Sequence, residues 1–307
     1  MILADRTFTL TLGSLQFNWL AQRFTDFYAA TADEAPVDRV VIGELVCSKR
    51  APFYADRIPA TIERLERGGK QVVLSSLALV TLERERHAAR ELFEQADHEV
   101  EINDLTLMNW ARQETPFSIG PLVNVYNEAT LAFLARRGAR RVCLPPELPF
   151  ASVETIAKTS SDLGAAIEVW AYGRIALAIS GRCYHARAHG LNKDSCQFVC
   201  EKDPDGLPTR TLDGVGFLAV NGVQTLSYKY ANLIGDLDRL AGAGVTGLRL
   251  SPHGGDFIAV TNAFADVASD RVSREEGLAR LRGATPGAEF TDGFLFGDCG
   301  AAPLAAF

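Results

Sequence analysis

The chain alternates between short apolar segments and amphipathic segments, at about 25 to 30 residues per pair over most of its length. Several apolar segments carry β-branched or other apolar residues at nearly every position, as in Val40-Val41-Ile42 and Val72-Val73-Leu74. Such segments are typical of strands that are covered on both faces. The predicted strands are Thr7–Leu12, Arg39–Gly43, Gln71–Ser75, His98–Ile102, Phe117–Gly120, Arg140–Leu144, Ala166–Ala171 and Val245–Leu250.

The amphipathic segments between these strands predict helices, because their apolar residues recur at helical spacing and they carry capping residues at their ends. Four of them are the clearest: a helix capped by Ser14 with the stripe Leu20, Phe24, Phe27 and Tyr28, one with the stripe Ile58, Ile62 and Leu65 that stops at Gly68-Gly69, one capped by Asn127 that ends at Gly138, and one capped by Ser152 that stops near Gly164.

Eight strands in alternation with helices predict an α/β fold, a (β/α)₈ TIM-like barrel in which irregularities are allowed. A doubly wound open sheet is the alternative. The alternation breaks after Ala171, because residues 172–229 carry no long helical stripe and predict a long, functional loop after the seventh strand. Within this loop, Val215–Val220 and Val223–Tyr228 flank Asn221-Gly222, which predicts a β-hairpin. We therefore expect one barrel domain over residues 1–307, with an insertion at 172–229.

Charge and hydropathy limit the classes of partner. The chain of 307 residues has 31 Lys and Arg against 38 Asp and Glu, a net charge of -7, whereas nucleic acid binding needs a positive field. The longest uncharged stretch, Thr7–Gln22, has 16 residues, short of the roughly 20 needed to cross a bilayer. Met1–Arg6 includes an acid and a base where a signal peptide would be apolar. We expect no nucleic acid partner, no transmembrane segment and a cytoplasmic location.

Two familiar motifs fail on their context. Gly242–Gly247 matches G-x-G-x-x-G, but it follows the predicted helix Asn232–Leu240 and leads into a strand, the reverse of a dinucleotide site. We interpret it as a helix C-cap and turn. His185 and His189 are spaced as in the zinc protease motif, but the Glu of that motif is absent. Neither a serine hydrolase nor a zinc hydrolase is supported.

Three of the six cysteines fall within 18 residues, as Cys183, Cys196 and Cys200. Several soft thiolates together select zinc, copper(I) or an iron–sulfur cluster, and the spacing leaves zinc, a cluster and inert thiols open, with a cluster favoured. Cys47 follows the second strand, so in a barrel it opens on the same face as the long loop. Cys143, at the end of its own strand, is the best substitute for this fourth ligand, with a small buried core residue as the alternative interpretation. Cys299 is expected to be a bystander.

The segment from Arg174 to Lys193 carries four Lys or Arg residues and no acid, although the whole chain is acidic. This charge would stabilise an anionic cluster or bind the carboxylates of a substrate, and a solvated basic loop is the alternative. Further candidates for a pocket lie at or just beyond the ends of strands, where a barrel carries its site, and each also has a structural interpretation. They are Glu44, Asn124, Tyr172, Arg174 and His253.

Several blocks resemble the collagenase-like (U-thirty-two) peptidase family over nearly the whole chain. They are Glu168-Val169-Trp170-Ala171-Tyr172-Gly173-Arg174-Ile175, Ser180-x-Arg182-Cys183, Lys193-Asp194-x-Cys196-x3-Cys200, Gly43-Glu44-x-x-Cys47-Ser48-Lys49-Arg50, Val220-Asn221-Gly222-x-Gln224-Thr225 and Arg249-Leu250-Ser251-Pro252. The resemblance implies a barrel-like fold and one 4Fe-4S cluster, held by Cys47, Cys183, Cys196 and Cys200 with the insertion at 172–229 as the cluster-binding part.

The resemblance is closest to the members that act in ubiquinone biosynthesis, and it implies an oxygen-independent ring hydroxylation there. The implied partner is a UbiU-type cluster protein in a heterodimer, and the implied substrate is an aromatic or isoprenoid quinone precursor. Prephenate is the hypothesised hydroxyl source, whose carboxylates would suit Arg174 and Arg182. We do not expect a peptidase, because no acyl-transfer nucleophile and base pair is present. A zinc-containing hydrolase of the family and a non-catalytic subunit stabilised by its cluster remain the alternatives.

Overall fold

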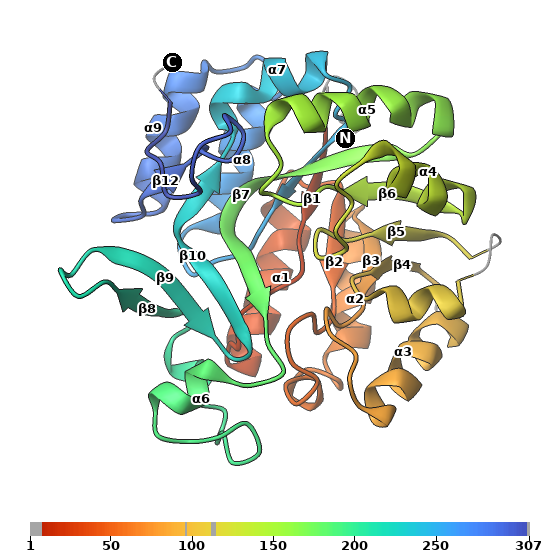
Figure 1. The fold of residues 1–307 in the computed structure, drawn as a ribbon, viewed down its shortest axis with the longest axis vertical. Coiled ribbons are helices and arrows are strands. Elements are labelled where there is room, and N and C mark those ends of the chain that lie inside the picture. Colours follow the sequence, from red (N-terminus) through yellow and green to blue (C-terminus); the bar gives the residue numbers. More distant parts are fainter. Residues whose placement is uncertain (1–7, 96, 112–114, 306–307) are drawn as a thin grey trace.

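A computed structural model describes residues 8–95, 97–111 and 115–305 of the chain (Figure 1). Thr7 of the first predicted strand lies outside these residues. So do Met1–Arg6, on which the expectation about a signal peptide depends.

Eight parallel strands close into a barrel. Each strand pairs with the next along the chain, and the last one, β11, pairs with both β7 and β1, which closes the ring. The predicted barrel is therefore confirmed, and the open sheet is wrong. The strands of the ring are β1 (Thr9–Leu12), β2 (Arg39–Ile42), β3 (Gln71–Ser75), β4 (Glu99–Ile102), β5 (Phe117–Ile119), β6 (Ala139–Cys143), β7 (Ala166–Ile179) and β11 (Gly247–Leu250).

Helices surround the ring on the outside, as Figure 1 shows for α1 to α5 and for α7 to α9. Their apolar faces pack on the strands and leave one main hydrophobic core. The α-helices are α1 (Ala21–Glu34), α2 (Ile58–Arg67), α3 (Glu83–Gln95), α4 (Glu128–Arg136), α5 (Phe150–Leu163), α6 (Tyr184–Ala188), α7 (Leu237–Gly242), α8 (Phe257–Val267) and α9 (Arg274–Ala284). Short 3₁₀ turns are η1 (Ala51–Phe53), η2 (Leu105–Asn109), η3 (Val199–Lys202) and η4 (Ile234–Asp236).

Several predicted helix ends agree with the structure. Asn127 caps α4, since its Oδ1 accepts a hydrogen bond from the amide of Thr130 at 2.9 Å. Gly68 is the C-cap of α2, and Gly164 ends α5 with a left-handed φ of 67°. The turn at Gly242–Gly247 also agrees, because it connects the end of α7 to the start of β11.

The predicted starts of three helices are wrong. Ser14 caps no helix, because all residues from Leu15 to Trp19 are buried in a non-helical connection, and α1 begins only at Ala21. Leu20 is accordingly exposed rather than part of the buried stripe. The helix predicted at Asn232–Leu240 begins later, because β10 continues through Asn232 and α7 starts at Leu237.

The start of α5 also differs from the prediction. The helix begins at Phe150, two residues before the predicted cap Ser152, and Pro149 occupies the N-cap position. Proline has no amide hydrogen to lose at a helix start, which explains why the helix can begin directly after it.

The segment 172–229 contains a small antiparallel sheet and is not simply a loop. β7 was predicted to end at Ala171, but it continues to Ile179 and pairs there with β10 (Gln224–Asn232). Gly173 has a φ of 111°, which only glycine adopts readily, and the strand turns out of the barrel wall at this residue. Beyond β10 lie β9 (Gly216–Asn221) and β8 (Leu207–Arg210), and Figure 1 shows them with α6 outside the ring. A further short strand, β12 (Phe290–Thr291), pairs with β10.

The predicted hairpin is present as β9 and β10, joined at Gly222-Val223. Gly222 has a φ of 67°, as the turn requires. None of the helices in the described part of the chain has the length and the apolar character that are needed to cross a bilayer.

Candidate metal centre

Four cysteines from distant parts of the chain line one small cavity. Cys47 comes from the loop after β2, Cys183 is the N-cap of α6, Cys200 lies in η3, and Cys196 lies between these two elements. The rest of the lining consists of Lys49, Arg50, Lys193, Phe198, Val199, Gly222 and Val223. The sequence places Cys47 136 positions before Cys183 (183 - 47), so only the fold brings these thiols together.

The loop that carries Cys47 is held by Glu44. The Glu44 carboxylate accepts hydrogen bonds from the amides of Val46 at 2.7 Å and Cys47 at 2.9 Å. Burial raises the pKa of Glu44, although Arg50 and these amides act in the opposite direction. Glu44, which we predicted as a pocket candidate, therefore orients the backbone that presents Cys47.

Cys183 is fixed by backbone contacts at the start of α6. Its Sγ accepts a hydrogen bond from the amide of Ala186 at 3.4 Å and lies 3.2 Å from the carbonyl oxygen of Gly222, to which the thiol donates. The hairpin turn at Gly222 thus serves as a support for Cys183. Burial raises the pKa of the Cys183 thiol and of the Cys47 thiol, so a bound cation would have to displace their protons.

Two left-handed residues, Gln197 and Phe198, separate Cys196 from Cys200. Their φ angles are 48° and 53°, a conformation that costs non-glycine residues on the order of 1–3 kcal/mol each. The Phe198 ring packs edge-on against Phe53, with ring centroids 4.6 Å apart, and so attaches this turn to the loop after β2. The strained turn brings both cysteines to the same cavity wall.

A buried guanidinium forms part of the same wall. Arg50 is 1% exposed, and it donates to the carbonyl oxygen of Gln16 at 3.0 Å and to Asn221 Oδ1 at 2.7 Å. Its Nε has no hydrogen-bond partner among the described residues. Burial alone would lower the pKa of Arg50, but Glu44, followed by Cys200 and Cys47 in their thiolate forms, raises it, so the group stays charged.

The donor set therefore suits a soft, anionic group. Four thiols offer sulfur ligands, and Lys49, Arg50 and Lys193 supply positive charge around them. Lys49 Nζ also donates to the carbonyl oxygen of Lys193 at 2.6 Å, which connects the loop after β2 to the segment after α6. A 4Fe-4S cluster bound by thiolates carries net negative charge, so these residues fit such a group.

The remaining cysteines lie elsewhere. Cys143 is buried at the end of β6, where its Sγ is 3.9 Å from the carbonyl oxygen of Leu144. Burial raises its pKa well above the usual value. Cys299 is exposed near the C-terminus. Neither of them lines the cavity, so the predicted substitute ligand is not beside the other thiols.

Three of the predicted pocket residues lie near one another, Tyr172 and Arg174 on β7 and His253 in the segment after β11. The Tyr172 hydroxyl lies 3.2 Å from His253 Nε2, and both side chains are buried among aromatic rings. Arg174 lies over the Tyr230 ring at 4.6 Å and donates to the carbonyl oxygen of Ser227 at 2.9 Å. Burial, and then Arg174, lower the pKa of His253 to about 4, so this imidazole is neutral near pH 7.

The other two predicted pocket residues do not belong to this aromatic group. Asn124 is exposed in the segment after β5, and Arg182 is exposed directly before Cys183. The amide of Arg182 donates to Ser180 Oγ at 3.1 Å. Arg182 thus adjoins the cysteine cavity in sequence, whereas Arg174 is held against carbonyl groups and rings.

A layer of charge inside the barrel was not anticipated from the sequence. Arg249 Nε donates to Glu168 Oε1 at 2.8 Å, and its Nη2 pairs with Glu101. Thr11 Oγ1 donates to Glu168 Oε2 at 2.5 Å. Burial alone would raise the pKa of Glu168, but Arg249 and Arg141 outweigh it and lower this pKa to about 2. Charged residues in the middle of otherwise apolar strands were the available signal.

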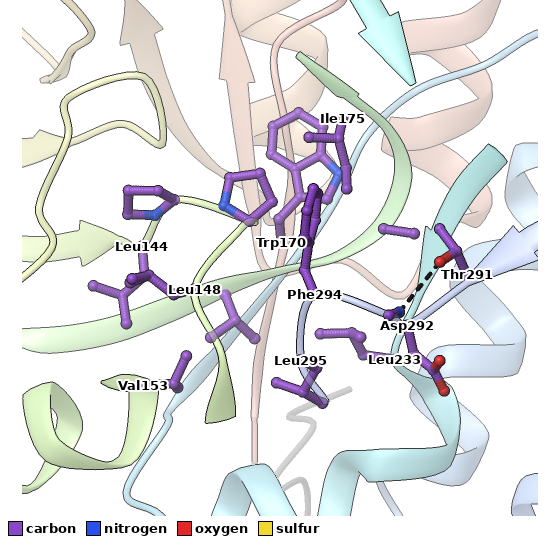
Figure 2. Close-up of a pocket in the computed structure, with 15 residues that line it drawn as sticks. Leu144, Leu148, Val153, Trp170, Ile175, Leu233, Thr291, Asp292, Phe294 and Leu295 are labelled. Carbon is purple, nitrogen blue, oxygen red and sulfur yellow. Dashed lines mark hydrogen bonds between the residues drawn. The ribbon is translucent and has the colours of Figure 1, made fainter. Parts of the chain in front are cut away.

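A separate apolar pocket lies between β7, β10 and the C-terminal segment (Figure 2). It has an empty volume of about 430 Å³. Figure 2 shows Trp170, Ile175 and Phe294 close together on one side, with Leu144, Leu148 and Val153 on the other. Trp170 Nε1 is buried and has no hydrogen-bond partner in the part of the chain that the structure describes.

The closed barrel and the thiol-lined cavity beside it define an enzyme-like TIM-barrel protein with a candidate metal centre. The family model of Peptidase family U32 matches residues 21–302 of the chain. The chain therefore belongs to this family, as the sequence blocks indicated.

Solved structures are similar to this chain at low identity. One is an enolase, a putative galactarate dehydratase, from Agrobacterium radiobacter, with 13% identity, a TM-score of 0.36 and coverage of 54% of this chain and 45% of that one. Another is a tryptophan synthase complex from Pyrococcus furiosus, with 10% identity, a TM-score of 0.43 and coverage of 91% and 99%. An uncharacterized B. cereus protein has 13% identity, a TM-score of 0.44 and coverage of 88% and 66%. The chain thus spans less than half of the enolase, and none of these likenesses bears on its chemistry.

Proposed function

We propose that Cys47, Cys183, Cys196 and Cys200 hold one 4Fe-4S cluster. The observation that carries this proposal is that four thiols from two distant segments line one cavity together with three cations. Arg50 Nε has no partner among the described residues, so its N–H could donate a hydrogen bond to a sulfide or thiolate of the cluster. When bound, such a cluster supplies one-electron redox chemistry.

A single zinc ion would need its sulfur ligands closer together than a cluster does. Tetrahedral zinc holds its sulfurs about 3.8 Å apart, since each Zn–S bond is about 2.3 Å. Among the described residues, the group of three possible ligands whose atoms all lie within 4.8 Å of one another is made of His and Asp, not of these cysteines. A cubane binds each thiolate to a different iron, so its four cysteine sulfurs lie farther apart than those around one zinc ion. The zinc-containing hydrolase is the alternative, and metal analysis of the purified protein separates the two.

We further propose that the chain acts as UbiV does, as the cluster subunit of an oxygen-independent ring hydroxylase in ubiquinone biosynthesis. This proposal rests on the sequence blocks that resemble that protein, and on membership of the U32 family, which is coarser. The partner would be a UbiU-type cluster protein in a heterodimer. The substrate would be an aromatic or isoprenoid quinone precursor, with prephenate as a hydroxyl source and the exposed Arg182 as a candidate for its carboxylates.

The cluster is tested by anaerobic purification of the wild-type protein and three cysteine variants. We expect about four iron atoms and four sulfide ions per wild-type chain, with a broad absorption band at about 400 nm. Cys196→Ala should lose this iron, because it removes one ligand from the cavity wall. Cys143→Ala and Cys299→Ala are the matched controls and should keep it, because neither thiol lines the cavity.

Two results would contradict the ligand assignment. One is equal iron in Cys196→Ala and Cys299→Ala, and the other is a colourless wild-type protein with one zinc per chain. The role of the cluster needs a second measurement. A cluster that takes up and releases electrons reversibly, with loss of ring hydroxylation in a Cys196→Ala strain that still forms the complex, would exclude a purely structural subunit.

A further inference from the structure

A second group of possible metal ligands lies on α6 and η3, the elements that carry Cys183 and Cys200. It consists of His185, His189 and Asp203, whose ligand atoms all lie within 4.8 Å of one another. His185 Nε2 is 3.0 Å from Asp203 Oδ2, and His189 Nε2 is 3.9 Å from the same oxygen. The two imidazole rings are nearly parallel, with centroids 5.3 Å apart. Their nitrogens thus converge on one carboxylate oxygen.

The local fold produces this convergence. His185 and His189 are spaced i, i+4 on α6 and its C-cap, so they share one face of the helix. Asp203 is the C-cap of η3, the turn that carries Cys200. Asn221 Nδ2 donates to the carbonyl oxygen of Cys200 at 3.0 Å and to that of Asp203 at 2.8 Å, which fixes η3 beside the hairpin.

His185 is the residue that indicates a missing ligand. Its side chain is completely buried, and its Nδ1 lies 3.0 Å from the carbonyl oxygen of Val220. A carbonyl can only accept, so Nδ1 carries the proton and Nε2 of the neutral ring presents a lone pair. This arrangement, in which a backbone carbonyl orients the ring, is the usual support of a metal-bound histidine. Nε2 makes no hydrogen bond of good geometry among the residues described, and the carboxylate beside it is Asp203, at 3.0 Å.

The distances match those between ligands of one cation, although the 3.0 Å between His185 Nε2 and Asp203 Oδ2 would equally suit an N–H···O hydrogen bond. Ligands at about 2.0–2.2 Å from a metal lie about 2.9 Å apart at a right angle and about 3.4 Å apart at the tetrahedral angle. The separation between His185 Nε2 and Asp203 Oδ2 falls in this range, and the His189 separation is slightly wider. Because a lone pair and a carboxylate repel each other, a cation between them would relieve an unfavourable contact.

We propose that His185, His189 and Asp203 bind one divalent transition-metal ion at a site separate from the cysteine cavity. Imidazole and carboxylate ligands suit zinc, iron(II) or cobalt(II), whereas magnesium and calcium prefer oxygen ligands. His189 and Asp203 are partly exposed, so solvent can fill the remaining coordination positions. The ion would join α6 to η3 and so couple the segments that carry Cys183 and Cys200.

Cobalt(II) is the probe for this site. Anaerobically purified full-length protein is dialysed to equilibrium against Co²⁺, and the cobalt retained per chain is measured for the wild type, Asp203→Asn and Asp213→Asn. Asp213 is a fully exposed acid in the turn between β8 and β9, which makes its variant a matched control. We expect Asp203→Asn to retain one cobalt per chain fewer than the other two proteins, with an affinity reduced by about tenfold or more.

All of these proteins keep the same cysteines, so the difference in bound cobalt between them does not depend on whether the cysteine cavity holds a cluster. This separates a failure of the present proposal from a failure of the proposed function. The visible spectrum provides a second readout, since the cobalt that is lost should lack thiolate charge-transfer absorption. His189→Gln, with His98→Gln as its control, repeats the test at a more exposed ligand in case Asp203→Asn disturbs the fold. Equal cobalt in the wild type, Asp203→Asn and His189→Gln would overturn the proposal and leave an ordinary His–Asp ion pair.

Discussion

The barrel interior and the cysteine cavity both bury positive charge, but they balance it in different ways. In the interior, Arg249 lies between the carboxylates of Glu168 and Glu101, so the chain itself supplies the opposite charge. In the cavity, the cations face thiols, and burial raises the pKa of both Cys47 and Cys183. Glu44 acts on Arg50 and Asp194 lies 3.8 Å from Lys49, but a thiol with a raised pKa is neutral near pH 7 and adds no negative charge.

This difference separates a scaffold from a candidate binding site. A buried set of charges that is balanced within the chain needs no ligand, and its removal is expected to affect folding. A site that places three cations beside neutral thiols can take up further negative charge when an anionic group binds. The strained turn at Gln197 and Phe198 lies in the cavity and not in the barrel, and such strain is usual at functional sites.

The largest expected effect is the loss of one interior carboxylate. Glu168→Gln would leave Arg249 with an incomplete set of partners in the barrel, and breaking such a buried pair costs about 3–5 kcal/mol. Urea unfolding measures this free energy. Glu63→Gln is the control, because its pair with Arg67 is exposed and worth about 0–1 kcal/mol. Equal losses in both variants would break the distinction between a buried scaffold and the surface.

The second largest expected effect is the loss of unfolding free energy at low pH. The pKa of Glu168 is about 2 in the folded protein, below its ordinary value of 4.5. A group with a lowered folded pKa contributes stability above its unfolded pKa and loses it as the pH falls toward the folded pKa. We expect roughly 3 kcal/mol to be lost from this group between about pH 4.5 and pH 2.

Unfolding free energies measured across this pH range, for the wild type and Glu168→Gln, check the prediction. The difference between the two proteins should shrink as the pH falls, because the variant has no carboxyl group to titrate at this position. Parallel curves would show that Glu168 does not titrate as its surroundings indicate.

The smallest expected effect compares two glycines of the insertion. Gly222 and Gly214 both have positive φ, but a β-carbon at Gly222 would come 2.2 Å from Arg50 Nη2, whereas one at Gly214 would meet nothing within 4 Å. Gly214→Ala should therefore cost only the backbone term, about 1–2 kcal/mol. Gly222→Ala should cost about 1–2 kcal/mol more, because Arg50 must give up its hydrogen bond to Asn221.

Urea unfolding and iron content, measured on both glycine variants, distinguish these costs. Gly222→Ala should also reduce iron content, since the turn supports Cys183 and the Arg50 wall. Identical stability and iron content in the two variants would show that the approach to Arg50 has no consequence, and would weaken the contrast between cavity and barrel.

Much of the fold could be predicted because its signals are local. All eight barrel strands were found from runs of apolar residues, and Asn127 and Gly164 marked helix ends through their own side chain or backbone preference. The errors have long-range causes. β7 continues beyond Ala171 because β10, more than 50 positions later, offers its edge, and α1 starts late because the segment before it is buried by the barrel.

The candidate site also has features that the sequence indicated and features that only the fold produces. The spacing of Cys183, Cys196 and Cys200 indicated a common site, and the rule that loops after barrel strands open on one face added Cys47. Nothing local indicated that Arg50 would be buried against Asn221, or that Glu44 would hold the Cys47 backbone. The failed zinc protease motif gave the spacing of His185 and His189, but Asp203 joins them only through the fold.

By itself, the sequence determined the alternation of strands and helices, the barrel class, the hairpin at Asn221-Gly222 and the family, because these depend on periodicity, turn chemistry and order along the chain. Only the tertiary structure decided which cysteines share a cavity, which cations face them, and where the interior charges find their partners. The physical reason is that burial and electrostatic pairing depend on distances in space, and those distances are set when the ring closes between β11 and β1.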